Sequence, residues 1–251
     1  MDSNWQPLDH LLLMRGDDCL ILGHRLSEWC GHGPILEQDM ALTNIALDLI
    51  GQARLYYQYA GERLGKTEDE LAYLRYERNY YNAWLVELPN SDFAHTIVRQ
   101  FYFDWYENAL LEALEGSTNE RLAGIAAKSR KEARYHRQYS SEWVIRLGDG
   151  TDESRRRIQA ALDLIIPYTG ELFQNVSLHQ ALIDDGSLPD MTGLWPGTEQ
   201  EILEVLREAG LALPDAPWLP ARGREGRHTE HLGFILTELQ YMQRAYPGLT
   251  W

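Results

Sequence analysis

The chain has 251 residues and a formal net charge of −15 at pH 7. This excess of acidic residues argues against a nucleic-acid or anionic membrane partner, because such partners carry charge of the same sign. It leaves room for a local basic patch that holds a phosphate-bearing ligand. Cys19 and Cys30 are the only cysteines. They indicate neither a disulfide scaffold nor a zinc site, and they fit a reducing cytoplasm.

No segment approaches the ~20 apolar residues that a membrane-spanning helix needs. The first ten residues, MDSNWQPLDH, lack the basic region and apolar run of a secretory signal. We therefore expect a cytoplasmic protein with no membrane and no nucleic-acid partner. Helical periodicity over most of the chain predicts an all-α fold with a single domain over residues 1–251.

Two helices are predicted in the first sixty residues, at about Pro7–Trp29 and Ile35–Gly61, separated by a Gly- and Pro-containing turn. The first has an apolar seam that contains no carboxylate. The seam of the second includes a polar residue, Gln52, three positions after Leu49. The two seams are Leu12, Arg15, Cys19, Leu22, Leu26 and Trp29, and Leu42, Ile45, Leu49, Gln52, Tyr56 and Tyr59.

A shorter helix is predicted from about Glu68 to Tyr81, and a longer one, rich in aromatic residues, from about Asp92 to Leu114. The aromatic stripe of the longer helix is typical of a core face. Asp104 lies on the inner row of the same helix. It could be a metal carboxylate, but a buried, hydrogen-bonded aspartate is the favoured interpretation.

The most regular helix is predicted from Ser117 to Leu147. Ser117 and Glu120 have the spacing of a capping box, and Gly148 and Gly150 mark the end. A seam of mostly small residues recurs at steps of four and three, which is typical of helices packed at a shallow angle. Its members are Leu122, Ala126, Ser129, Ala133, His136, Ser140, Trp143 and Leu147.

His136 is an imidazole in the middle of this core stripe. Ferritin-like di-iron proteins place Glu-x-x-His on two helices, with a further Glu on each of two others. Here Ala133 takes the position three before His136, and Leu49 takes the position three before Gln52. Both helices keep the spacing but lack the carboxylate, which predicts a degenerate di-iron site. A core histidine with a hydrogen-bond partner is the favoured interpretation of His136.

The remainder is predicted to be helical with two long connections. Thr151 caps a helix over Asp152–Phe173 that Pro167 kinks or divides. The segment Gln174–Pro196 is irregular and long enough to have a binding role. Thr198 and Glu201 form a second capping box, which opens a helix that ends at Gly210.

A Pro-rich linker with Arg222, Arg224 and Arg227 precedes the last helix, Thr229–Ala245. His228 and His231 have a spacing that resembles a metal motif. They flank a helix start, however, and capping and surface contacts explain them without a metal.

Four blocks of sequence resemble one family, the PaaC family of non-catalytic subunits of bacterial phenylacetyl-CoA 1,2-epoxidases. The resemblance extends from the first helix to the last residue. The blocks are residues 26–34 (LSEWCGHGP), 44–54 (NIALDLIGQAR), 131–136 (KEARYH), and 228–233 (HTEHLG) with the tail 247–251.

The resemblance implies a ferritin-like helical bundle that has no metal and no cofactor of its own. It implies a heterodimer with a PaaA-like subunit that holds a di-iron centre, a PaaB-like bridging subunit, and a PaaE-like reductase with FAD, an Fe–S cluster and NADPH. The implied reaction is epoxidation of the phenyl ring of phenylacetyl-CoA by O2. The isolated chain could form a homodimer, and it is not expected to be catalytic by itself.

The resemblance also implies that the chain helps to hold the CoA thioester and contains no catalytic residue. The implied substrate-binding residues are Asn79, Tyr80, Tyr81 and Asn82, with Gln180, Ala181 and Leu182. The surrounding sequence diverges from the family pattern. Aromatic residues that helical periodicity does not require inside, namely Trp5, Tyr80, Tyr81, Trp84 and Trp195, would supply a partner surface.

Two other functions stay open from the sequence. One is a self-sufficient di-iron oxidase with the unusual ligands Glu37, Asp48, Asp104, Glu132 and His136. The other is an all-helical scaffold with no metal ancestry. Metal content separates the oxidase from the other two, and binding to the iron-bearing subunit separates the structural subunit from the scaffold.

Overall fold

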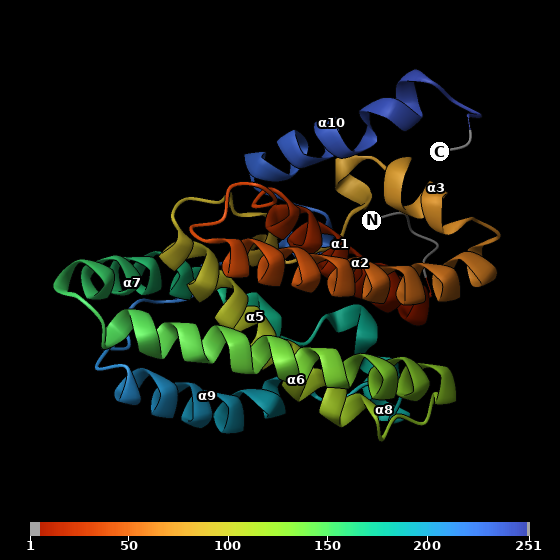
Figure 1. Ribbon diagram of the computed structural model, residues 1–251. Helices are drawn as coiled ribbons and strands as arrows, with labels where there is room; N and C mark the ends of the chain where they lie inside the picture. Colours follow the sequence, from red (N-terminus) through yellow and green to blue (C-terminus); the bar gives the residue numbers. More distant parts are fainter. Residues whose placement is uncertain (1–5, 250–251) are drawn as a thin grey trace. The chain divides into compact units, whose positions relative to one another are not determined.

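The computed structural model describes residues 6–249 (Figure 1). These residues form helices joined by turns and short coils, with no strand and one isolated antiparallel bridge between Arg222 and Arg227. The all-α prediction is thereby confirmed. The α-helices are α1 (Pro7–Ser27), α2 (Leu36–Leu64), α3 (Glu68–Tyr73), α4 (Trp84–Glu87), α5 (Phe93–Leu114), α6 (Glu120–Gly148), α7 (Asp152–Ile165), α8 (Gln180–Asp184), α9 (Met191–Glu208) and α10 (Glu230–Ala245). The 3-10 turns are η1 (Glu77–Asn79), η2 (Ile166–Tyr168), η3 (Gly170–Phe173), η4 (Ser177–His179) and η5 (Gly223–Glu225).

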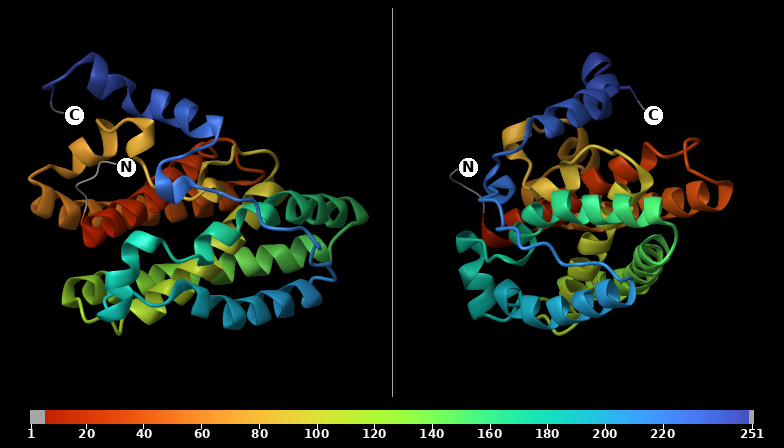
Figure 2. Two further views of the ribbon diagram at one scale, coloured as in Figure 1. Left: turned by 180° about the vertical axis from the view of Figure 1, so that it is seen from behind. Right: turned by 90° about the vertical axis from the view of Figure 1, so that its left-hand side faces the viewer.

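The chain divides into two compact units, residues 1–89 with 222–251, and residues 90–221. A single domain over the whole chain stays a prediction. The first unit therefore contains both ends of the sequence. In it, α1 and α2 pack along their lengths, and α10 lies beside α3 (Figures 1 and 2). In the second unit, α5 packs against α6 and α7, and α9 packs against both α5 and α6.

Helix α1 is buried on nearly every side, including its two adjacent aspartates, Asp17 and Asp18. Its predicted seam residues from Leu12 to Leu26 are in the core, but so are most of the polar side chains between them; α1 ends at Ser27, before the predicted Trp29, which is half-buried. A helix that is enclosed all round must satisfy each buried charge within the protein, because water cannot reach it. This requirement determines the arrangement of the polar network described below.

The seam of α6 is confirmed over most of the helix. Leu122, Ala133 and His136 are each 1% exposed. Toward the C-terminus Trp143 and Leu147 are only half-buried, and Val144 and Gly148 take their place inside. A strict alternation of four and three has a period of 3.5, whereas the helix has 3.6 residues per turn, so the inward face drifts by about 20° per heptad.

Of the three caps predicted, one is correct and two are wrong. Thr151 forms a capping box with Ser154, as predicted, and the last helix, α10, begins one residue later than predicted, with Thr229 as its cap. At α6 the cap is Asn119, whose side chain accepts a hydrogen bond from the backbone N–H of Leu122. Ser117 instead donates its hydroxyl to the carbonyl of Ser187, 2.7 Å away.

The helix predicted to open at Thr198 starts earlier, at Met191, with Asp190 as its cap. Pro196 lies inside it, and the Thr198 hydroxyl donates to the carbonyl of Leu194 at 2.9 Å. The segment Gln174–Pro196 is therefore more ordered than predicted, because it also contains η4 and α8.

The other predicted bounds need smaller corrections. The helix predicted over Glu68–Tyr81 ends at Tyr73, and an extended segment with one 3-10 turn follows. The helix predicted over Asp152–Phe173 ends at Ile165, next to Pro167.

Candidate functional site

Asp18 of α1 is the centre of a buried ion cluster in the first unit. The Nη1 atom of Arg224 lies 2.8 Å and 2.7 Å from its two carboxylate oxygens, and the backbone N–H of Ala83 donates to it at 2.9 Å. Arg15 lies one turn away on the same helix, with its Nη1 atom 3.4 Å from the carboxylate. The cluster joins three segments that are far apart in sequence.

Asp17, the residue before Asp18, contacts Arg75, Tyr57 and the backbone of Tyr81. It pairs with Arg75, accepts a hydrogen bond from the Tyr57 hydroxyl at 2.6 Å, and accepts one from the backbone N–H of Tyr81 at 2.7 Å. Arg75 also donates to the carbonyl of Asn79 at 2.7 Å. The two aspartates together hold the backbone of residues 79–83 in place.

Glu87, at the end of α4, is the second anchor of this region. Its Oε1 accepts from the backbone N–H of Thr229 at 2.7 Å, and its Oε2 accepts from the Asn82 side chain at 3.1 Å. The Nδ1 atom of His228 lies 3.0 Å from the same Oε2, and its Nε2 atom lies 2.8 Å from the carbonyl oxygen of Tyr80. Both acceptors lack a proton to donate, so both ring nitrogens carry hydrogen in this arrangement. We call Asp17, Asp18, Glu87 and His228 the clamp.

Burial by itself lowers the pKa of His228, but the hydrogen bond to Glu87, the negative charge of Glu87 and the Tyr80 carbonyl outweigh burial and raise the pKa. The imidazolium is thus stabilised in the native state. The side chain of His228 is 0% exposed, so the predicted surface contact is wrong. A second buried histidine of the first unit, His10, differs: burial lowers its pKa to about 4, and its Nε2 donates to the carbonyl of Arg224 at 3.0 Å.

The substrate-binding residues predicted at 79–82 lie within the clamp. Tyr80, Tyr81 and Asn82 are each 0% exposed, while Asn79 is half-buried. The prediction that Tyr80 and Tyr81 supply a partner surface is therefore wrong, because their rings are in the core. A role of residues 79–82 in substrate binding stays a prediction.

The other residues of the predicted partner surface are partly enclosed. Trp84 is half-buried and donates its indole N–H to the carbonyl of Arg227 at 2.6 Å. Trp195 is half-buried against Phe173 and Trp218. Trp5 lies outside the described residues.

The second predicted substrate stretch belongs to the second unit. Gln180 and Ala181 are exposed at the start of α8, and Gln180 donates to Asp184 at 2.8 Å. Leu182 is 8% exposed and packs inward. Nothing in the geometry of α8 tests its predicted contact with substrate.

A separate polar group lies between α5 and α6. Asp104 is 1% exposed, and its Oδ1 accepts from the Gln100 side chain at 2.6 Å, which confirms a buried, hydrogen-bonded aspartate. Burial raises the pKa of Asp104 to about 7, against the opposing effects of His136 and of hydrogen bonds from Ser140 and Gln100. His136 is likewise buried in the core. Within residues 6–249, no group of three or more His, Cys, Asp or Glu side chains is arranged to hold a metal ion.

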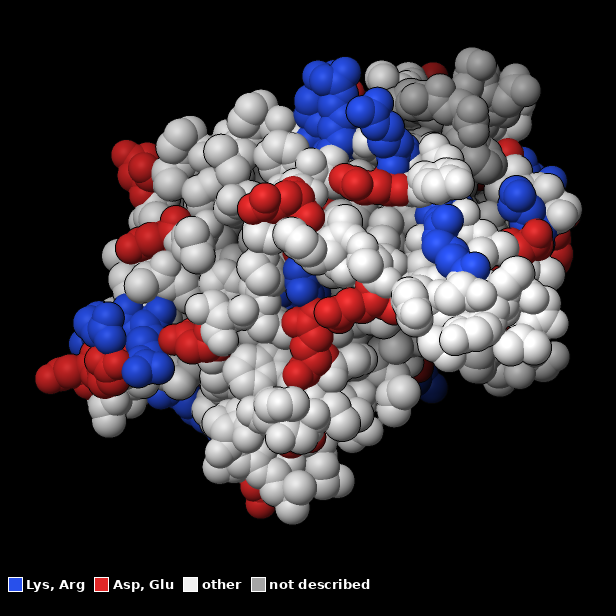
Figure 3. All heavy atoms as spheres, turned by 90° about the horizontal axis from the view of Figure 1, so that it is seen from above, with Lys and Arg blue, Asp and Glu red and all other residues white. Residues whose placement is uncertain are grey.

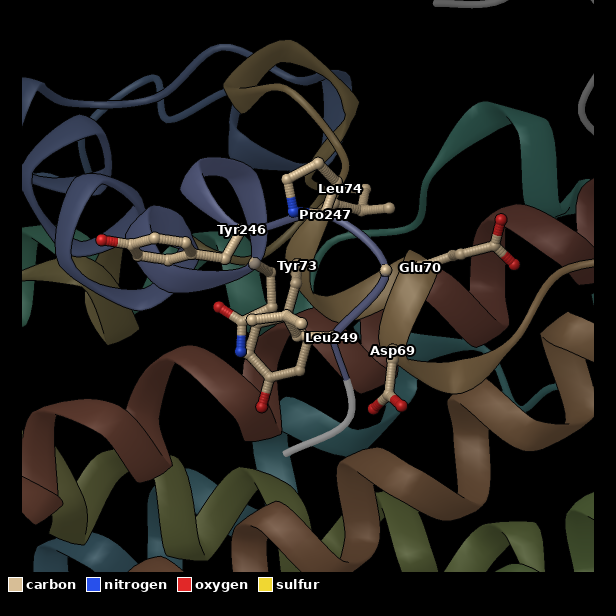
Figure 4. A pocket seen from close by; sticks show the side chains of 9 residues that line it. Asp69, Glu70, Tyr73, Leu74, Tyr246, Pro247 and Leu249 are labelled. Carbon is tan, nitrogen blue, oxygen red and sulfur yellow. The ribbon is translucent and has the colours of Figure 1, made fainter.

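A cavity of about 460 Å³ opens beside α3 at the end of α10 (Figure 4). Tyr73, Leu74 and Tyr246 give it an apolar wall, and Asp69 and Glu70 lie along another side. The two carboxylates would repel an anionic ligand, so this cavity does not suit a phosphate-bearing thioester.

An all-helical protein with buried polar clusters in each unit is a broad class, and comparison with known proteins narrows it. The family described as phenylacetic acid catabolic protein (PaaA/PaaC) matches residues 1–251, and the chain belongs to this family. The chain is 46% identical over 240 residues to the C subunit of the 1,2-phenylacetyl-CoA epoxidase of Escherichia coli (strain K12). The alignment covers 95% of this chain and 97% of that protein. None of the helices built from residues 6–249 has the length and hydropathy of a membrane span.

Proposed function

We propose that this chain is a structural, non-catalytic subunit of a multicomponent phenylacetyl-CoA 1,2-epoxidase that acts in aerobic phenylacetate catabolism. The observation that supports this most strongly is the 46% identity, over nearly the full length of both proteins, to a protein whose name makes it one subunit of such an enzyme. That name implies an assembly of several chains. We place this assembly in the cytoplasm.

In the proposed complex, the partner subunit and not this chain reacts with O2. A PaaA-like subunit holds the di-iron centre that activates O2, a PaaB-like subunit bridges, and a PaaE-like reductase delivers electrons from NADPH through FAD and an Fe–S cluster. In this chain Leu49 and Ala133 occupy positions where a di-iron bundle has carboxylates, and both are 1% exposed. These apolar residues support a degenerate, metal-free site in a ferritin-like bundle.

Exposed apolar side chains support a role in assembly. Large apolar side chains that stay at the surface often mark protein contacts. On α2, Leu36, Met40 and Leu47 are 71%, 57% and 61% exposed. On α10, Phe234 and Tyr241 are 68% and 62% exposed. An obligate contact of this class typically buries over ~2,000 Å².

Copurification with the PaaA-like subunit tests the proposal. We expect a stable complex of the two chains. Its iron should be bound by the PaaA-like subunit and not by this chain. About two irons per isolated chain by elemental analysis would instead favour a self-sufficient oxidase. Failure to bind the PaaA-like subunit would favour a scaffold with another role, and sedimentation of the isolated chain would show whether it forms a homodimer.

A further inference from the structure

A second, larger cavity lies in the first unit, at the surface beside the clamp. It has a volume of about 610 Å³ and opens where η1 approaches the segment 225–228. Gly226 makes this approach possible: it has φ +74°, and a Cβ atom there would lie 2.3 Å from the carbonyl oxygen of Arg78. The lining residues are Glu77, Arg78, Glu225, Gly226, Arg227 and His228.

The three arginines around this turn have different surroundings. Arg224 points inward to Asp18, and Arg222 pairs with Glu225 through its Nε, 2.9 Å from the carboxylate. Arg227 is exposed, and so is Arg78 on the facing turn. Among residues 6–249, neither Arg78 nor Arg227 has a hydrogen-bond or ion-pair partner for its guanidinium.

Two of the other charged residues that line the cavity, His228 and Glu225, form ion pairs. His228 is neutralised by Glu87, and Glu225 by Arg222. Glu77 is exposed and is the one lining carboxylate that no basic group offsets within the described residues. Two guanidinium groups against one carboxylate leave the cavity with an excess of positive charge.

This excess is unusual in a chain of net charge −15. The face that Figure 3 shows has acidic and basic side chains interspersed among large uncharged areas. Two arginines without counter-ions in one cavity are therefore a local feature, and an anionic ligand would complete their hydrogen bonding.

We propose that this cavity binds a phosphate group, with Arg78 and Arg227 as its ligands. A guanidinium presents a planar fork of N–H donors that matches phosphate oxygens, and two such groups can hold one phosphate from opposite sides. Asn79, the one partly exposed residue of the stretch 79–82, directly follows Arg78. If the proposed function is right, the phosphates of the CoA thioester are the source of this group.

Binding of coenzyme A, dephospho-coenzyme A, pantetheine and inorganic phosphate to the purified full-length chain, measured by calorimetry at low ionic strength, tests the site. The double variant Arg78→Ala/Arg227→Ala should weaken binding of the phosphate-bearing probes by about tenfold or more, as loss of charged hydrogen bonds predicts. Arg134→Ala, an exposed arginine of α6, removes one positive charge elsewhere and should leave the affinity unchanged.

Glu77→Gln should change the affinity in the direction opposite to the arginine variants. It removes the unbalanced carboxylate from the lining, so the affinity for coenzyme A should rise. The dependence of this affinity on salt should persist in Glu77→Gln and should weaken in the arginine variants. If Glu77 had a purely structural role, its replacement by Gln would not raise the affinity for coenzyme A.

Tighter binding of coenzyme A than of inorganic phosphate, lost in the arginine variants, supports the site with the thioester as its source. Equal affinities for coenzyme A and inorganic phosphate, both lost in the arginine variants, would support a phosphate site. They would also show that the site does not recognise the CoA thioester in particular. Identical affinities of wild type and the double variant, or no binding of any phosphate-bearing probe, would overturn the proposal. None of these results bears on complex formation with the PaaA-like subunit, which tests the proposed function separately.

Discussion

Arg224 and Asp18 are 206 positions apart in the sequence, yet one guanidinium nitrogen of Arg224 lies within 2.8 Å of both carboxylate oxygens of Asp18. The pair joins the segment before α10 to the centre of α1. It gives a physical reason why the first unit is assembled from both ends of the chain. Buried ion pairs tolerate the loss of one partner poorly, since the other charge is then left in a medium that cannot solvate it.

Asp18→Asn should therefore destabilise the protein by about 3–5 kcal/mol, because it keeps the shape of the side chain and leaves Arg224 uncompensated. Denaturant unfolding followed by circular dichroism measures the loss. Asp163→Asn is the matched control, since Asp163 is exposed on α7, and it should change stability by no more than about 0.5 kcal/mol. Equal stability of the two variants would mean that the buried pair contributes nothing.

The pair of His228 and Glu87 should make stability depend on pH. The native pKa of His228 is raised, so the native state binds the proton more tightly than the unfolded chain does. Its stabilising contribution is complete below the ordinary pKa of about 6.5 and is lost as the pH rises through the native value. The difference in unfolding free energy between wild type and His228→Gln should shrink over that range.

Unfolding measured at intervals from about pH 5.5 to about pH 9 on both proteins provides the test. His32→Gln serves as the control, because His32 is exposed and lies outside the clamp. A gap between wild type and His228→Gln that stays constant with pH would show that the imidazolium is not what holds the Tyr80 carbonyl.

Asp104 should make stability depend on pH in the same direction, through a carboxyl group of the second unit. Burial raises its pKa from 3.8 to about 7, so the native state binds a proton that the unfolded chain has released. Stability should then fall as the pH rises from about 4 to 7, by up to about 4 kcal/mol at about 1.36 kcal/mol per pKa unit. Asp104→Asn removes this ionisation and should be more stable than wild type at about pH 8, while the two are similar at about pH 4. A variant less stable than wild type at the higher pH would contradict the raised pKa.

The inward face of α6 can be tested with an introduced carboxylate. Ala133→Glu places an unpaired charge at a position that is 1% exposed and should destabilise the fold by several kcal/mol. Ala127→Glu makes the same change on the exposed face of the same helix and should have little effect. Similar melting temperatures for the two variants would place Ala133 at the surface.

The helices were predictable where periodicity was long and regular. The bounds of α2 and α5 lie within a few residues of the predicted ones, and Thr151 was identified as a cap, because these features depend on neighbours in the sequence. Capping residues are common, however, and Ser117 and Thr198 satisfied the local spacing without forming caps. At both places a residue nearby, Asn119 or Asp190, was better placed by the packing of the helix.

The polar clusters could not be predicted in the same way. Asp17 and Asp18 lie off the apolar seam of α1, a position that on most helices faces water. Their burial results from segments that fold over α1 from residues 75–83 and 222–228, which no local pattern indicates. One signal was present: Asp17 and Asp18 are adjacent and are directly followed by the apolar run Cys19–Leu22, and such a pair requires cationic partners if the helix is enclosed.

In the proposed function, this chain supports the epoxidase without performing its chemistry. Phenylacetyl-CoA epoxidation with the PaaA-like subunit, the reductase and NADPH, measured as product formed with and without this chain, tests that claim most directly. We predict turnover only when both the PaaA-like subunit and this chain are present, and none from this chain with the reductase alone. Full activity without this chain, or product formed by this chain with only a reductase, would contradict it.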